Sequence, residues 1–217
     1  DLSKGPKIYS DMLAQPSTEA GRKAPTRTIL PINDAQIDQI AGTFYQTPED
    51  QTFRVSNIQT VVPRGSVMTP ADLFMGYIIN AALGDRPIYF ATTTQSFESL
   101  QLRPFLIRQG VAFKLNDGPI QPDPARGILP LGDDELSRWA GEWIDVPRTE
   151  LLLSQVFIHR SGLPEWGHWV DVATQNIPYY YHAGHLILAR VYGAMGDTAS
   201  MARHARISQD WGELSSR

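Results

Sequence analysis

Hydrophobic and polar positions follow two different periods along the chain. Residues 53–62 (FRVSNIQTVV) alternate apolar and polar positions and then become apolar, which predicts a strand that enters a core. Residues 69–83 (TPADLFMGYIINAAL) repeat their apolar positions at helical spacing, and Thr69 and Asp72 form an N-terminal helix signature. Gly84 is expected to end this helix.

Two further strands and a second helix are predicted to follow. Residues 86–93 (RPIYFATT) predict a compact apolar strand, residues 96–110 (SFESLQLRPFLIRQG) a helix broken near Pro104, and residues 111–115 (VAFKL) another strand. Strand, helix, strand, helix, strand is the βαβαβ pattern, in which right-handed crossovers place parallel strands in one sheet. We therefore predict an α/β fold with a small parallel βαβαβ sheet unit over residues 53–115.

Composition changes on both sides of this unit. Residues 1–52 are rich in Pro, Gly, Thr and charged residues and are predicted to form an irregular lead-in, with a short helix over residues 34–45. Residues 116–133 hold four prolines and three glycines, which indicates a connection or a long surface loop. Residues 134–217 are predicted to form an all-helical, tetratricopeptide-like tail.

The tail contains four segments with helical patterns. Residues 133–143 and 149–162 predict two helices, and residues 177–196 and 197–213 predict a helical hairpin with a Gly-Asp turn. The hairpin is similar to one degenerate tetratricopeptide repeat. Its first helix carries the matching residues Leu188, Ala189, Tyr192 and Gly196. Because one repeat cannot bury its own face, we expect the hairpin to pack on the preceding helices.

Bulk composition narrows the possible function classes. The 217 residues are 42% hydrophobic and 19% charged, which is enough for a buried core. The net charge of −4 is spread without long runs, so no nucleic-acid partner is expected. There is no cysteine, which excludes disulfides and a cysteine nucleophile. The chain opens on DLSKGPKIYSD without a signal peptide or an initiator Met, so we expect a fragment of a longer protein.

Three motifs resemble, in order and spacing, the soluble tail of a bacterial family of large membrane proteins. They lie at residues 86–91, 102–106 and 110–115, where that family typically has Arg-Pro-(Ile/Val)-Tyr-Phe-Ala, Leu-x-Pro-Tyr-Leu and Gly-Leu-Ala-Tyr-Arg-Leu. Residues 171–181 and the hairpin behind them also fit, so the resemblance covers residues 53–211. The family is similar to the protein O-mannosyltransferase-type enzymes of the C superfamily of glycosyltransferases.

The resemblance implies a division of labour within a larger protein. In such enzymes the catalytic acid lies in the first extracytoplasmic loop of the membrane part, and the donor is a lipid-linked or otherwise activated sugar. The resemblance therefore implies a non-catalytic domain on the extracytoplasmic (periplasmic) face, tethered to the membrane through an N-terminal region outside this chain. Its role would be to position or recognise a polypeptide or glycan acceptor. No cofactor and no catalytic residue of its own is expected.

Two stretches are candidate ligand-binding sites. One is the polar loop after the strand at residues 86–93, where the amides of a following helix would attract an anion or a hydroxylated ligand. The other is a concentration of aromatic rings, on which a sugar or a peptide can lie. The candidate residues are Thr92, Thr93, Thr94, Gln95 and Ser96 in the loop, and Trp166, Trp169 and Tyr180 among the aromatic residues. Helix capping and a packed aromatic seam explain the same residues without a ligand.

Two other functions remain open from the sequence. The chain could be a stand-alone protein-interaction module with tetratricopeptide-like helices, or a small-molecule enzyme that uses the loop at residues 92–96. A metal site is not expected. His182 and His185 are three positions apart and His168 is a conceivable third ligand, but the usual zinc-helix pattern has a four-residue spacing with an acidic residue between.

Overall fold

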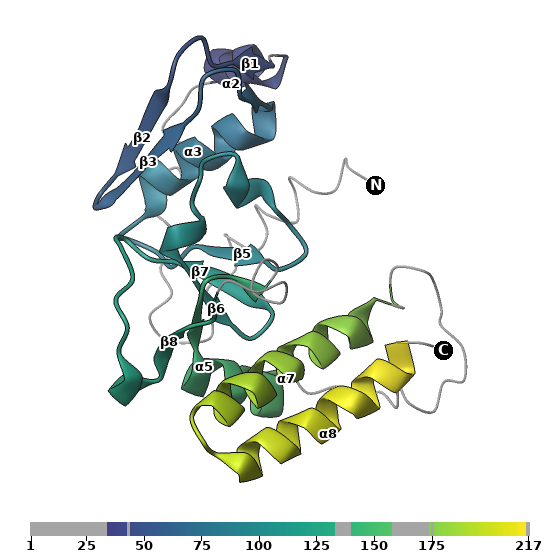
Figure 1. Cartoon of the computed structure of the whole chain (residues 1–217). Coiled ribbons are helices and arrows are strands. Elements are labelled where there is room, and N and C mark those ends of the chain that lie inside the picture. The colour runs from purple at the N-terminus through teal and green to yellow at the C-terminus, as the bar shows by residue number, and fades with distance from the viewer. Residues whose placement is uncertain (1–33, 43, 133–139, 158–173, 175, 216–217) are drawn as a thin grey trace, which may run out of the picture.

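The computed structural model describes residues 34–42, 44–132, 140–157, 174 and 176–215. Figure 1 shows three regions from top to bottom: an N-terminal layer of short strand pairs and helices, a central sheet, and a C-terminal helical hairpin. The predicted α/β class is confirmed, because a five-stranded sheet is combined with helices and the described chain ends in the hairpin. The predicted parallel βαβαβ arrangement is wrong.

The N-terminal layer contains two helices and two antiparallel strand pairs. Its elements are α2 (Asp34–Ala41), β1 (Tyr45–Gln46) paired with β4 (Val67–Met68), β2 (Gln51–Val55) paired with β3 (Ile58–Val62), and α3 (Pro70–Ala82). Helix α3 begins as predicted, because Thr69 and Asp72 form a capping box in which the Thr69 N–H donates to Asp72 Oδ2 at 2.8 Å. Gly84 follows it with a φ of 87°.

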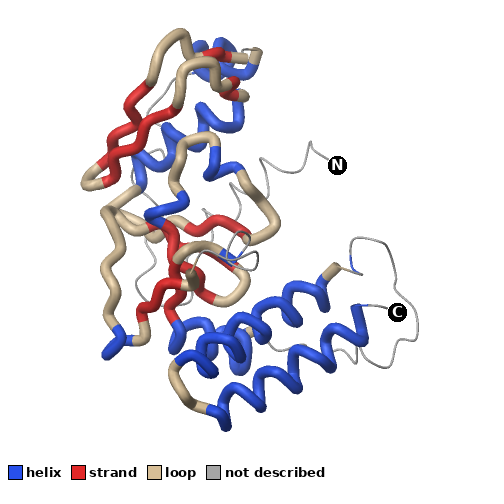
Figure 2. The backbone as a smooth tube through the Cα atoms, in the orientation of Figure 1, coloured by secondary structure: helices blue, strands red, loops and turns tan. Residues whose placement is uncertain are grey.

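The predicted single strand over residues 53–62 is instead a hairpin. The polar pair Ser56–Asn57 forms a two-residue turn, Ser56 has a φ of 51°, and Val55 pairs with Ile58. Figure 2 shows this hairpin apart from the central sheet. The β2–β3 hairpin therefore packs its side chains into a hydrophobic core without belonging to the central sheet.

The central sheet has the strand order β5-β7-β6-β9-β8. The strands are β5 (Tyr89–Ala91), β6 (Leu106–Gln109), β7 (Ala112–Leu115), β8 (Ile128–Pro130) and β9 (Trp143–Asp145). Only the β6–β9 pair is parallel, and the other three pairs are antiparallel. In a parallel βαβαβ unit, successive strands are joined by helical crossovers, whereas β6 and β7 are successive antiparallel neighbours.

The reason for this difference lies in residues 96–110, which do not form the predicted helix. They form two short 3₁₀ turns, η2 (Ser96–Glu98) and η3 (Arg103–Phe105), and then strand β6. Gln101 has a φ of 55°, which interrupts a right-handed helix between the two turns. Gly110, with a φ of 64°, then turns the chain directly into β7. A tight turn joins strands as antiparallel neighbours.

The region after β7 also departs from the prediction. The expected connection at residues 116–133 contains the short turn η4 (Pro124–Arg126) and strand β8. A helix was predicted over residues 133–143, but Trp143 begins strand β9, so the tail is not all-helical as expected. Residues 133–139 lie outside the described residues. The next helix is confirmed in part: it starts at α5 (Val146–Leu151) and continues as a π-helical turn, η5 (Leu152–Val156).

The helical hairpin forms as predicted. Helix α7 (Ile177–Ala194) and helix α8 (Thr198–Ser215) are joined by a turn in which Gly196 has a φ of 80°. The Asp197 carboxylate accepts a hydrogen bond from the Ser200 N–H at 3.0 Å and thereby caps α8. Helix α7 packs against α5 and η5, and α8 lies against α7 (Figure 1).

Two hydrophobic cores lie on one face of the sheet. The first packs β2, β3 and α3 against Phe90, Leu106, Phe113 and Leu115 of strands β5, β6 and β7. The second packs α5 and α7 against Ile144 of β9, with Ile187 and Leu188 of α7 fully buried. Side chains alternate along a strand, so the residues between these positions point to the opposite face.

Arg108 of β6 is a buried cation between the two cores. Its side chain donates to the carbonyl oxygen of Ala140 at 2.6 Å and to that of Gly110 at 3.1 Å, and its guanidinium lies 4.9 Å from the ring centre of Phe113. Burial lowers the pKa of Arg108 to about 9, so the group is still charged at neutral pH. The guanidinium therefore joins the turn after β6, the segment before β9 and the first core.

Replacing Arg108 by lysine tests this arrangement. We expect Arg108→Lys to lower the free energy of unfolding by about 2 kcal/mol, because two different guanidinium nitrogens bond the two carbonyls and a single ammonium nitrogen cannot occupy both positions. Urea denaturation measures the change. Arg54→Lys, at an exposed position with a single side-chain partner in Gln59, should change stability by less than about 0.5 kcal/mol. Equal denaturation midpoints for both variants would show that the buried guanidinium has no such role.

Candidate functional site

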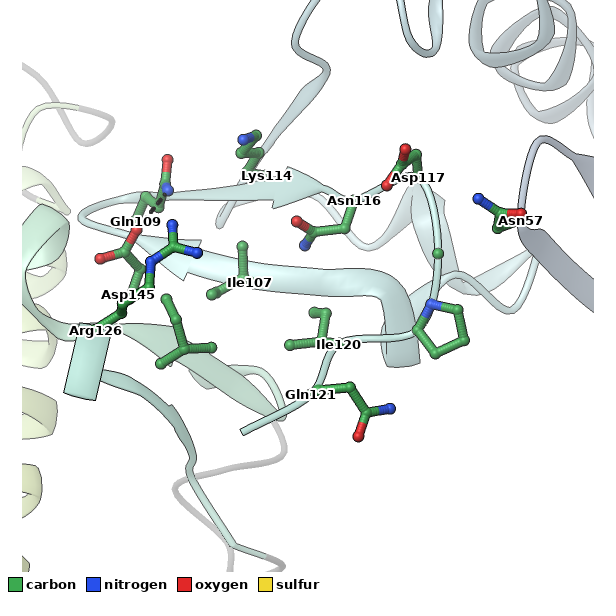
Figure 3. Close-up of a pocket in the computed structure, with 13 residues that line it drawn as sticks. Asn57, Ile107, Gln109, Lys114, Asn116, Asp117, Ile120, Gln121, Arg126 and Asp145 are labelled. Carbon is green, nitrogen blue, oxygen red and sulfur yellow. Dashed lines mark hydrogen bonds between the residues drawn. The ribbon is translucent and has the colours of Figure 1, made fainter. Parts of the chain in front are cut away.

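The face of the sheet opposite the two cores carries a groove. Five of its residues alternate with core residues along the strands: Ile107 and Gln109 in β6, Lys114 in β7, Asp145 in β9 and Ile128 in β8. The groove has a volume of about 500 Å³, within the range of ligand sites. Figure 3 shows Gln109 and Asp145 toward one end and Asn116 and Asp117 toward the other.

A second wall of the groove comes from the loop after β7 and from the N-terminal hairpin. Residues 116–121 run alongside the sheet face, and Asn57 at the β2–β3 turn closes that end (Figure 3). The Asn57 N–H donates to the Asp117 carbonyl oxygen at 3.0 Å. Gly118 permits this close approach, because a Cβ there would lie 3.0 Å from Asn57 Cβ. The groove therefore depends on two segments that are far apart in the sequence.

Hydrogen bonds hold the polar end of the groove in one arrangement. The Tyr89 hydroxyl donates to Gln109 Oε1 at 3.1 Å, and Gln109 Nε2 donates to Asp145 Oδ2 at 2.9 Å. The other Asp145 oxygen accepts from the Arg148 N–H at 3.0 Å, which caps helix α5. Asp145 thus serves both the groove and the start of the helix, and its carboxylate is engaged in structural bonds.

The lining combines an apolar floor with a polar rim. The apolar contact surface comes from the partly exposed Ile120 and Ile128, while Ile107 lies buried beneath them at 5% exposure. The rim supplies both charges and several amides, from Lys114, Arg126, Asp117, Asp145, Asn57, Asn116, Gln109 and Gln121. Arg126 is highly exposed and lies 3.9 Å from the Asp123 carboxylate. None of the thirteen described residues that line the groove is aromatic. Such a surface suits a ligand that offers both donors and acceptors along an apolar stem.

The predicted threonine loop has a different geometry from the one expected. Thr92 donates to the Val111 carbonyl oxygen at 3.1 Å, and Thr94 donates to the Ser96 hydroxyl at 3.0 Å. Thr93 and Gln95 are exposed. The loop leads into the three-residue turn η2, so the helix amides expected at this place are missing. The adjoining cavity of about 30 Å³ has room for only about one or two water molecules.

The predicted aromatic platform is described only in part. Tyr180 is half-buried near the start of α7, and its ring lies edge-on to Tyr179 with 5.8 Å between the centroids. Trp166 and Trp169 lie outside the described residues. The structure does not bring Tyr180 or the threonine loop into the groove.

The described histidines have separate partners. His182 contacts Ser208, with 2.8 Å between His182 Nδ1 and the Ser208 carbonyl oxygen, whereas His185 contacts His204. His168 lies outside the described residues. Within the described ranges, no group of three His, Asp or Glu side chains is placed to hold a metal ion.

The groove was missed at the sequence level because one of its strands was assigned to a helix. With residues 106–109 read as part of a helix, Ile107 and Gln109 cannot be placed on the same face as Lys114. The sequence signal that favours a hairpin here is Gly110, which lies between the two short segments LIRQ and AFKL.

Comparisons with known proteins add no family to this description. No protein-family model, no curated protein and no solved structure matches the chain. Among the described helices, none combines the length and the apolar character needed to cross a membrane. The function is therefore inferred from the geometry of the groove together with the resemblance of the sequence motifs.

The double role of Asp145 can be tested by substitution. We expect Asp145→Ala to lower the free energy of unfolding by about 2 kcal/mol, because it removes the cap of α5 and the acceptor of Gln109. Asp145→Asn keeps a capping oxygen and should lose less than about 1 kcal/mol. Urea denaturation measures both. Asp123→Ala is the control, since Asp123 caps only the three-residue turn η4. A loss as large in Asp123→Ala as in Asp145→Ala would contradict the proposed role.

Proposed function

We propose that this chain is a non-catalytic recognition domain that positions a polypeptide acceptor for a membrane glycosyltransferase-like protein, on the extracytoplasmic side of the membrane. The observation that carries the recognition role is the groove on the open sheet face, with its apolar floor and its rim of amides and charges. The membrane tether and the glycosyltransferase context come from the motif resemblance at residues 86–91, 102–106 and 110–115.

The lining of the groove favours a polypeptide over a glycan. An extended peptide presents N–H donors and C=O acceptors in alternation, and the rim offers partners of both kinds in Asn57, Asn116 and Gln121. Its apolar side chains would contact the isoleucine floor. Proteins commonly hold sugar rings on aromatic faces, and the described lining has none. Among the aromatic candidates, Tyr180 does not line the groove, and Trp166 and Trp169 lie outside the described residues.

The groove is also preorganised, which favours binding. Gln109 is held between Tyr89 and Asp145, so its amide does not need to be ordered when a ligand arrives. Asn116 is fixed by a hydrogen bond that its side-chain amide donates to the Phe105 carbonyl oxygen at 3.2 Å. Lys114 and Asp117 supply opposite charges at intermediate and exposed positions on the rim. These two residues are the natural targets for a binding test.

The helical hairpin is interpreted as a single degenerate tetratricopeptide repeat that supports the sheet. Leu188 and Ala189 are buried, and α7 packs on α5, as one repeat requires. Gly193 faces Met201 of α8, where an added Cβ would lie 3.1 Å from the sulfur atom. The hairpin therefore buries faces of α7 against both α5 and α8.

Binding by the groove is tested with two sets of probes. An array of short unstructured peptides and an array of soluble oligosaccharides are incubated with the chain, and the strongest ligands are measured by calorimetry. We expect peptides to bind, and Lys114→Ala/Asp117→Ala to weaken binding at least about tenfold, or ~1.4 kcal/mol. Arg54→Ala, exposed on β2 and outside the groove, should keep the affinity of the original chain.

The outcomes of this test are distinct. Binding of oligosaccharides without peptides would replace the polypeptide acceptor by a glycan. Peptide binding that survives Lys114→Ala/Asp117→Ala would place recognition on another surface. Urea denaturation of each variant shows whether a lost affinity follows from lost folding.

A further inference from the structure

Two histidines are buried against each other between the helices of the hairpin. His185 of α7 is 3% exposed and His204 of α8 is 0% exposed. Their Nδ1 atoms are 2.9 Å apart, and the two rings meet edge to edge through these atoms, with 5.2 Å between centroids and 22° between planes. A contact of this length between two ring nitrogens is a hydrogen bond, so exactly one of the two Nδ1 atoms carries the proton when both rings are neutral.

Residues from three helices surround the pair. The ring of Tyr192 of α7 lies nearly parallel to that of His204, with 5.5 Å between centroids and 7° between planes. Glu150 of α5 accepts hydrogen bonds from the Tyr192 hydroxyl and from the Arg203 guanidinium of α8. The charged and titratable groups that face the pair or its neighbours are therefore Glu150 from α5, Tyr192 from α7, Arg203 from α8 and Asp197 from the turn between α7 and α8.

The surroundings of His204 Nε2 indicate which tautomer each of the two rings adopts. His204 Nε2 is buried without a hydrogen-bond partner in the described part of the chain, and it lies 3.6 Å from Glu150 Oε1. A proton on Nε2 is attracted to that carboxylate, whereas a lone pair would be repelled by it. His204 therefore carries its proton on Nε2 and accepts through Nδ1, and His185 donates through Nδ1.

Protonation of the two rings at acidic pH destabilises this hydrogen-bonded pair. Burial lowers the pKa of His185 to about 4, and the neighbouring His204 and Arg203 add to the effect while Glu150 opposes it. Burial, followed by Arg203, also lowers the pKa of His204. A second proton on both rings would place an N–H on each Nδ1 and break their hydrogen bond.

The direction of the pH effect follows from proton counting. When the helices separate, both rings regain the ordinary histidine pKa of about 6.5 and bind protons below it. The docked hairpin binds fewer protons than the separated one between about pH 6.5 and about pH 4. Docking is therefore fully stable above this window and weakens as the pH falls through it.

We propose that the buried His185–His204 pair is an acid-sensitive latch, whose protonation separates α8 from α7 and releases Arg203 of α8 from Glu150 of α5. The latch is a local opening, because the pair lies in the α7–α8 interface and outside both the sheet and the groove. It is independent of the polypeptide-binding role proposed for the groove. An extracytoplasmic compartment that follows external pH would supply the signal.

Amide hydrogen exchange of the whole chain tests the latch. After correction for the intrinsic exchange rate, we expect the protection of α8 to fall about tenfold per pH unit for each titrating histidine below about pH 6.5. The variant His185→Asn/His204→Asn keeps one amide donor and one acceptor where the Nδ1 atoms lie, but it does not titrate. Its α8 protection should be nearly constant between about pH 7 and about pH 5. A slope equal to that of the original chain would overturn the proposal.

A control variant and a second measurement complete the test. His182 lies at the same interface and contacts Ser208, so His182→Asn should keep the pH slope of the original chain. A flat profile in His182→Asn would overturn the assignment to the buried pair. If the double variant does not fold, the ring resonances of His185 and His204 are titrated by NMR in the original chain. Midpoints below about pH 6.5 support the latch, and midpoints at or above it contradict the latch.

Discussion

The fold depends on one buried cation at the meeting point of two hydrophobic cores. Arg108 is fully desolvated, so its charge is tolerated only because carbonyl oxygens and the face of Phe113 surround it. One carbonyl belongs to Ala140 beside the second core, and the ring belongs to the first core. A sheet with only one parallel pair is thereby held at its centre, where β6 meets both β7 and β9.

Helix α5 connects this centre to the two surfaces that carry proposed roles. Its cap, Asp145, lies in the groove, and the hydroxyl of Thr149 donates to the Arg108 carbonyl oxygen and accepts from the Gly110 N–H. The next residue, Glu150, contacts Tyr192 and Arg203 of the hairpin. Through Asp145, Thr149 and Glu150, this short helix and its cap therefore contact the groove, the backbone of Arg108 and the hairpin.

Features that rest on contacts between residues close in sequence could be predicted, and features that rest on distant contacts could not. The capping box of α3 and the hairpin α7–α8 rest on contacts between residues close in sequence, and both were predicted correctly. Strand β6 was taken for part of a helix because LIRQ is short and does not alternate, and its pairing with β7 and β9 is what defines it as a strand. The groove needs that pairing and the distant turn at Asn57, so no single stretch could reveal it. The buried contact of His185 with His204 was likewise invisible, since it joins residues 19 positions apart across two helices.

Because Asn57 closes one end of the groove, the β2–β3 turn influences how the ligand preference of this surface can change. Because the β2–β3 hairpin pairs with itself and not with the central sheet, yet contacts Asp117, the rim is shared between two layers of the fold. Lengthening or shortening that turn would reshape the rim while leaving every strand of the large sheet in register. Changes in the β2–β3 turn alone can therefore alter which ligands the groove prefers. An engineered protein that contained the central sheet without this hairpin would have one end of the rim open.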